Sequence, residues 1–214
     1  MLVSGRGRNM QALCAACADG RIAADPVLVL SDVADAPALD RAGRVGVPTV
    51  AVPRREFPGR AAFDAALGEA LDAVRPDIVA LAGFMRVLGP ELVARFAGRM
   101  LNIHPSLLPK YPGLHTHRRA LAAGDRLHGA TVHFVTAALD GGPRVVCGTV
   151  CVARADDEAS LAMRVLEQVE LKIYPQAVAW MARGDLRLED GRVKFAGREL
   201  VEPLTLEDVE VAFR

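Results

Sequence analysis

Short runs rich in valine, isoleucine and leucine alternate with segments of helical period through the first hundred residues, and this alternation constrains the fold most. Five strands are expected, at Leu2–Val3, Val27–Ser31, Thr49–Val52, Ile78–Ala82 and Met100–Ile103. Four helices are expected between them, at Asn9–Asp19, Pro37–Arg44, Arg60–Val74 and Pro90–Phe96. Parallel strands need a crossover, which is usually a helix. The pattern therefore predicts an α/β fold with a mainly parallel, twisted sheet and helices on both faces.

The second half of the chain has a different pattern. Two valine-rich segments, Thr131–Thr136 and Val145–Ala153, are separated by a turn too short for a crossover helix, so they are predicted to pair antiparallel. A long helix is predicted from about Asp157 to Arg183, with an aspartate cap at its start and a kink at Pro175. Val193–Phe195 is predicted as an edge strand.

Composition limits the class of protein. The chain has 214 residues, 51% of them hydrophobic and 24% charged, which is enough for one large core, and we interpret residues 1–214 as a single domain. Basic and acidic residues number 26 each, so the surplus of positive charge that nucleic-acid binding requires is missing. No apolar run approaches the roughly 18 residues that span a bilayer. We expect neither a nucleic-acid nor a membrane partner, and a cytoplasmic location.

The four cysteines form two close pairs. Cys14 and Cys17 make a C-x-x-C sequence, which is compatible with redox chemistry or half of a zinc site. Both thiols follow the apolar face of a predicted helix, whereas Cys147 and Cys151 lie in a predicted strand. Buried structural thiols are therefore expected, with no metal.

All histidines of the chain fall within about 30 residues of one another. They are His104, His115, His117, His128 and His133. This window begins at the end of the fifth expected strand, and open α/β sheets bind ligands outside the carboxyl ends of their strands. The functional site is predicted to lie there.

Asn102 and His104 are two residues apart on that strand, so their side chains share one face of the sheet. An amide beside an imidazole can donate to a developing oxyanion, and a carboxylate would keep the imidazole protonated. Asp140, at the end of the following strand and before a Gly-Gly-Pro turn, is the expected carboxylate. Two other interpretations stay open: a structural histidine with a turn aspartate, and a metal site in the His-x-His sequence that begins at His115.

A second candidate site is the sequence SGRGRN at residues 4–9, which follows the first strand and opens the first helix. Helix N-termini in this position favour a phosphate group. A dinucleotide fingerprint would have glycine where Met10 stands, although Asp32 could act as its acidic ribose ligand. A single phosphate therefore fits better, and an oxidoreductase is the weaker alternative.

Three motifs, in order, closely resemble the phosphoribosylglycinamide formyltransferase family. They are NIHPSLLPKYPGLHTH at 102–117, HGATVHFV at 128–135 and LDGGP at 139–143. SGRG at 4–7 and LAGFMR at 81–86 are similar to that family's phosphate loop and folate-pocket segment, and the likeness extends from about Val3 to about Leu200. The resemblance implies a Rossmann-like fold. It also implies metal-free transfer of a formyl group from 10-formyltetrahydrofolate to the amine of glycinamide ribonucleotide, a step of purine synthesis.

By position, the resemblance assigns roles to individual residues. The catalytic trio is Asn102, His104 and Asp140, with His133 in support. The glycinamide ribonucleotide contacts fall on Gly7, Arg8, Asn9 and Glu170. The folate contacts fall on Arg60, Met85, Arg86, Val87, Leu88, Asn102, Thr136 and Asp140. Residues 1–100 are then the nucleotide-phosphate-binding half of the domain, residues 101–200 the folate-binding and catalytic half, and residues 201–214 a tail.

Related folate enzymes are the alternatives. Formyltetrahydrofolate deformylase and methionyl-tRNA formyltransferase use a similar trio, but each has an extra domain that we do not expect here. A noncatalytic folate-binding or nucleotide-binding module would be expected to lose a member of the trio. The chain departs from the resemblance at Arg8, where serine is usual, and at Arg144 and Cys147. We expect a monomer or homodimer, and either a natural chain that begins several residues upstream or an unusually weak first strand.

Overall fold

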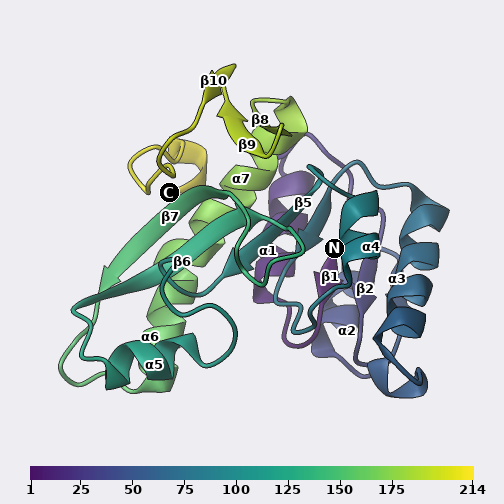
Figure 1. Ribbon diagram of the computed structural model, residues 1–214, viewed down its shortest axis with the longest axis horizontal. Helices are drawn as coiled ribbons and strands as arrows, with labels where there is room; N and C mark the ends of the chain where they lie inside the picture. Colours follow the sequence, from purple (N-terminus) through teal and green to yellow (C-terminus); the bar gives the residue numbers. More distant parts are fainter.

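Seven strands form one twisted sheet in the computed structural model, which describes residues 1–214 (Figure 1). Their order in space is β3-β2-β1-β4-β5-β6-β7. Their bounds are β1 Leu2–Val3, β2 Val29–Ser31, β3 Thr49–Ala51, β4 Val79–Leu81, β5 Met100–His104, β6 Leu127–Phe134 and β7 Arg144–Cys151. Strands β1 to β5 are parallel, and β6 and β7 are antiparallel. The predicted fold class is confirmed.

Helices cover both faces of this sheet (Figure 1). Their bounds are α1 Arg8–Ala18, α2 Pro37–Arg44, α3 Arg60–Val74, α4 Pro90–Arg95, α5 Thr116–Ala122, α6 Glu158–Val165 and α7 Leu171–Arg183. Residues Arg54–Glu56 and Val211–Phe213 form short 3-10 turns. Buried side chains of α1, α2, α6 and α7 pack against one face, and those of α3 and α4 pack against the other. No helix is both long and apolar enough to cross a membrane.

The central strands are apolar on both faces because each face is covered. In β1, Leu2 belongs to the core under α3 and α4, whereas Val3 belongs to the core under α1 and α7. In β4, Val79 and Leu81 lie on the first of these faces and Ala80 lies on the second. Continuous burial of this kind is typical of parallel strands between two helical layers. It explains why the sequence shows apolar runs and no alternation.

The first strand is short, as expected. β1 pairs with β2 over two residues and with β4 over one. The amino group of Met1 donates to the carbonyl of Leu28 at 2.7 Å, and its burial lowers its pKa to about 6.

The long helix predicted from about Asp157 to Arg183 is interrupted. Asp157 caps α6 in a reciprocal capping box with Ser160. The irregularity is a π-helical turn at Leu166–Glu170, and α7 then continues as α-helix through Pro175. In a regular helix, the ring of Pro175 would crowd the carbonyl of Leu171, four residues earlier. The wider π-helical turn ends directly before Leu171.

A separate three-stranded antiparallel sheet, β10-β9-β8, lies above the end of α7 in Figure 1. It consists of β8 Leu186–Glu189, β9 Arg192–Phe195 and β10 Arg198–Glu199. The prediction of an edge strand at Val193–Phe195 is therefore wrong, because β9 is the middle strand. The reason is two tight turns in which Asp190-Gly191 and Ala196-Gly197 all have positive φ, the conformation that two-residue hairpins require.

The expectation of buried thiols is wrong for Cys151. All four cysteines are free; Cys14 is buried, Cys17 and Cys147 are half-buried, and Cys151 is exposed. Cys151 is the last residue of β7, the edge strand. Leu204 covers that edge only near Val146, so the Cys151 end stays open to solvent. Within the segment 201–214, Val209 and Phe213 are buried in the core.

Candidate active site

Strand β5 presents Asn102 and His104 on one face, as predicted. Leu101 and Ile103 point to the opposite face and pack in the core under α7. Asn102 is directly opposite His133 on β6, so these two side chains also share a face. The site therefore begins as a row of polar side chains at the carboxyl end of the parallel sheet.

A cavity of about 700 Å³ opens over this row. Its walls are the loop between β4 and α4, the end of β5, the segment 113–117 that leads into α5, and the loop after β6. Nine of the residues assigned from sequence line it: Met85, Arg86, Val87, Leu88, Asn102, His104, His133, Thr136 and Asp140. A volume of this size suits a small organic ligand.

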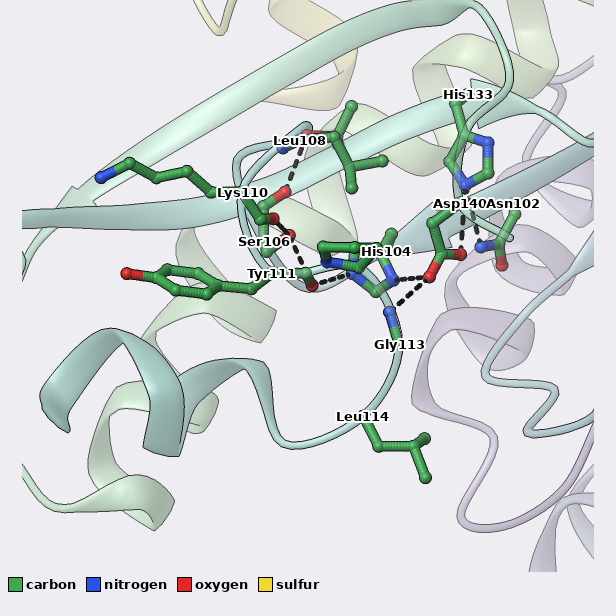
Figure 2. A network of polar contacts seen from close by, with 12 residues as sticks. Asn102, His104, Ser106, Leu108, Lys110, Tyr111, Gly113, Leu114, His133 and Asp140 are labelled. Atoms are coloured by element: carbon green, nitrogen blue, oxygen red, sulfur yellow. Dashed lines mark hydrogen bonds and ion pairs between the residues drawn. The ribbon is translucent and has the colours of Figure 1, made fainter. Parts of the chain in front are cut away.

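Backbone contacts fix the protonation pattern of His104 (Figure 2). Its Nε2 atom lies 2.9 Å from the carbonyl oxygen of Tyr111. A carbonyl only accepts hydrogen bonds, so Nε2 carries a proton. The other nitrogen, Nδ1, lies 3.4 Å from Oδ2 of Asp140, and the ring is buried. The Nδ1 atom of His104 therefore faces the carboxylate of Asp140.

Asp140 reaches this position from a loop. The sequence places it at the end of a strand, and that prediction is wrong, because β6 ends at Phe134, six residues earlier. Asp140 has a φ of 47°, a left-handed conformation that aspartate tolerates better than most residues. The backbone N–H of Gly113 donates to its Oδ2 atom at 2.7 Å, so two loops meet at this carboxylate (Figure 2).

His133 orients the amide of Asn102. Nδ1 of His133 lies 2.9 Å from its neighbour's carbonyl, that of Phe134, and therefore carries the proton. Burial lowers the pKa of His133, which keeps the ring neutral and leaves Nε2 as an acceptor. The Nδ2 atom of Asn102 lies 3.1 Å from that Nε2 and donates to it. The second N–H of the same amide is left for a ligand.

Two further histidines form a pair beside the cavity. Nε2 of His128 lies 3.1 Å from Nδ1 of His117, and burial lowers the pKa of both rings, that of His117 to about 4. His115 also lines the cavity, with a positive φ of 58°. No group of three metal-ligating side chains occurs in the structure.

The glycine-rich loop gathers a second set of polar groups at the N-terminus of α1. Gly7 has a φ of 71°, and a Cβ there would lie 2.6 Å from that of Ala38, so only glycine fits. Asn9 donates to the buried Glu170 at 2.6 Å, and desolvation of Glu170 raises its pKa to about 6. Arg8 pairs with Glu167 on the same π-helical turn at 3.5 Å. The four residues assigned to the nucleotide thus lie together, outside the lining of the 700 Å³ cavity.

The family follows from comparison with known proteins. The formyl transferase family model matches residues 1–178. The chain belongs to the formyl transferase family. It is 46% identical to the phosphoribosylglycinamide formyltransferase of Escherichia coli over 200 residues, which are 94% of each chain.

Solved structures with a similar fold agree with the sequence match. The phosphoribosylglycinamide formyltransferase of Coxiella burnetii superimposes with a TM-score of 0.89 at 42% identity, over 95% of this chain and 96% of the other. A formyltetrahydrofolate deformylase of Pseudomonas putida has a TM-score of 0.80 at 25% identity, over 91% of this chain and 68% of the other.

Four further residues singled out from the sequence do not line the 700 Å³ cavity. Arg60 begins α3, is exposed and does not line the cavity. Asp32, the ribose ligand of the oxidoreductase alternative, is buried and bonds to Arg86. Arg144 donates to the carbonyl of Leu108 at 2.9 Å, and Cys147 is half-buried.

Sequence reasoning missed the backbone groups of the site. The carbonyl of Tyr111 and the N–H of Gly113 hold His104 and Asp140, yet backbone groups have no residue-type signature. The signal that was present is the sequence from 105 to 113, which has three prolines and ends in a glycine. In the structure this stretch contains a cis Leu108–Pro109 bond and a positive φ at Tyr111. Such a sequence indicates a specifically shaped loop but not what it contacts.

Proposed function

We propose that this formyl transferase moves the formyl group of 10-formyltetrahydrofolate to the amine of glycinamide ribonucleotide in purine synthesis. The supporting observation is the meeting of Asn102, His104 and Asp140, from β5 and a distant loop, on the wall of one cavity. The identity to phosphoribosylglycinamide formyltransferases over nearly the whole chain supports the choice of acceptor. The folate occupies the cavity, with Met85, Arg86, Val87, Leu88 and Thr136 around it.

The nucleotide binds at the glycine-rich loop. Its phosphate lies at the N-terminus of α1 beside Gly7, Arg8 and Asn9, where free N–H groups and the helix dipole favour an anion. Its glycinamide end lies against Glu170, which is already held by Asn9. The nucleotide's amine is directed from there toward the cavity.

In the reaction, the amine attacks the formyl carbon and a new C–N bond forms while the carbonyl oxygen becomes negative. The free N–H of Asn102 donates to this oxygen, because His133 holds the other one. The Nε2–H of His104 already donates to the carbonyl of Tyr111, so only a proton on Nδ1 is free to stabilise the reacting oxygen. Asp140 stabilises the imidazolium and, through water, moves the amine proton toward the folate nitrogen, whose bond to the carbon then breaks.

Hydrolysis of the same co-substrate is the second candidate, because a deformylase shares the fold. In that reaction, water replaces the amine as the nucleophile. The two activities differ in one measurable respect, which is whether release of tetrahydrofolate requires the nucleotide.

The test is to follow tetrahydrofolate release from 10-formyltetrahydrofolate with and without glycinamide ribonucleotide, and to assay the formylated nucleotide. The proposal expects release only with the nucleotide, in equal amount to the product. Equal rates in both reactions would instead identify a hydrolase. Sedimentation of the purified enzyme distinguishes a monomer from a homodimer. The proposed role in purine synthesis implies a cytoplasmic location.

A further inference from the structure

The segment Gly83–Gly89 forms one wall of the cavity. It joins β4 to α4 and contains no helix or strand. Six consecutive residues of this segment line the cavity: Gly83, Phe84, Met85, Arg86, Val87 and Leu88. Since no ladder or helix fixes such a segment, individual contacts must determine where it lies.

Both ends of this wall are attached to neighbouring elements. At the start, Ser4 donates its N–H to the carbonyl of Gly83 at 3.1 Å, and its hydroxyl accepts from the N–H of Met85 at 2.8 Å. At the end, a carboxylate oxygen of Asp64 accepts from the N–H of Gly89 at 2.8 Å. These contacts leave the residues between 85 and 89 to be fixed in another way.

The middle of the wall is held by one side-chain hydrogen bond. No backbone group of residues 86–88 makes a hydrogen bond within the protein. Nε of Arg86 donates to Oδ2 of Asp32 at 2.6 Å, and this is the one hydrogen bond of these three residues. The Asp32 side chain is 0% exposed, whereas that of Arg86 is 47% exposed. The rigid partner is therefore Asp32.

Asp32 is well placed to act as this anchor. It directly follows β2, and its own carbonyl accepts from the N–H of Arg54 at 3.1 Å. Its second carboxylate oxygen is buried and has no partner, so Arg86 is the group that compensates the burial of its charge. Losing this contact would leave the wall with no hydrogen bond between its two ends, although the buried side chain of Leu88 still packs in the core under α3 and α4.

We propose that Asp32 is a positioning residue for the folate site, and that it acts through Arg86 to fix residues 86–88. The free backbone groups of these residues then face the co-substrate in one arrangement. We call the contact between Asp32 and Arg86 the clamp. The inference rests on the proposed function for the identity of the ligand, but the clamp itself is a property of the fold.

The first test compares Asp32→Ala with Gln176→Ala. Gln176 is an equally buried polar residue with one unpartnered atom, and it holds the N–H of Glu210, outside the lining of the cavity. Asp32→Ala is expected to raise the KM for 10-formyltetrahydrofolate roughly tenfold, a factor that corresponds to about 1.4 kcal/mol of lost coupling. Its kcat and its KM for the nucleotide stay near wild type. Gln176→Ala lowers stability and leaves both KM values unchanged.

A conservative variant adds a check. Asp32→Asn retains an oxygen that accepts from Arg86 and is expected to recover most of the folate KM. Should Asp32→Ala fail to fold, Arg86→Lys ends the Nε contact while keeping a cation beside the carboxylate, and the same rise in KM is expected. An unchanged folate KM, or equal changes in all three kinetic parameters, would overturn the proposal.

Hydrogen exchange tests the clamp without any activity. The amides of Met85 and Gly89, the two hydrogen-bonded amides of the segment 83–89, are expected to exchange faster in Asp32→Ala than in wild type or Gln176→Ala. If the wild-type protein transfers no formyl group but this local change is seen, the proposed function fails and the clamp stands. If exchange in the wall is unaltered, the clamp is refuted whatever the activity.

Discussion

Glu170 carries a cost in stability that its replacement should reveal. The residue is 8% exposed, and the one hydrogen bond of its side chain comes from Asn9. Desolvation raises its pKa from 4.5 to about 6. A group whose folded pKa is raised in this way destabilises the protein once it is ionised, so stability falls as pH rises from about 4.5 to about 6. The change corresponds to about 2 kcal/mol at neutral pH.

Glu170→Gln keeps the shape and the acceptor for Asn9 but removes the buried charge. It is expected to unfold at higher urea concentration than wild type at pH 7.5, with a gain of about 2 kcal/mol, or a rise in Tm of roughly 4 to 8 °C for a chain of this size. Near pH 4, where Glu170 is already neutral, the two proteins should unfold alike. Activity should fall, because the carboxylate is proposed to hold the glycinamide end of the nucleotide.

Glu167→Gln is the matched control, since Glu167 lies on the same π-helical turn with its side chain 56% exposed. It should change stability little at any pH. Urea unfolding of the three proteins between pH 4 and 8 checks these statements. A Glu170→Gln protein no more stable than wild type at pH 7.5, or a gain that does not depend on pH, would refute the reasoning.

Three further predictions concern the catalytic trio, the phosphate loop and the histidine pair. Alanine at Asn102, His104 or Asp140 should lower single-turnover formyl transfer at least about a hundred-fold, with nearly normal calorimetric binding of both substrates; near-normal turnover of His104→Ala would return that residue to a structural role. Arg8→Ser should raise the KM for the nucleotide about two- to fivefold at low salt, a modest factor because Arg8 also pairs with Glu167, and a shifted folate KM instead would contradict this placement. The pKa of His117 is lowered from 6.5 to about 4, so on acidification this histidine is protonated in the unfolded chain before it is protonated in the folded one, and the stability should fall from pH 6.5 toward pH 4. His117→Phe should flatten this part of the stability profile. An unaltered profile would argue against the buried pair of His117 and His128.

The order of the first hundred residues determined the fold class by itself. Parallel strands covered on two sides must be apolar on two sides, and the crossover helices must show a helical period, so both signals are local and strong. The bounds of α2 and α3 follow from such local patterns, and so does the placement of Asn102 and His104 on one face of β5. The motifs around these residues also indicated the family and the trio.

Local sequence was less informative where non-local contacts decide the structure. The π-helical turn at Leu166–Glu170 aligns Glu167 and Glu170 with the start of α1, more than 150 residues away in the chain. The position of β9 between two neighbours depended on paired tight turns, and the exposure of Cys151 depended on which part of the edge strand Leu204 covers. Each is a packing outcome that no window of sequence contains.

The chemistry of the site was determined in the same way. Residue types predicted an amide, an imidazole and a carboxylate, but only the tertiary structure showed which nitrogen carries a proton in His104 and in His133. That depends on the carbonyls of Tyr111 and Phe134, which any residue type would supply. The same holds for Asp32 and Arg86, 54 residues apart, whose contact becomes visible only once β2 and β4 lie on either side of β1. Sequence specifies side chains, whereas backbone groups and long-range pairs obtain their roles from the fold.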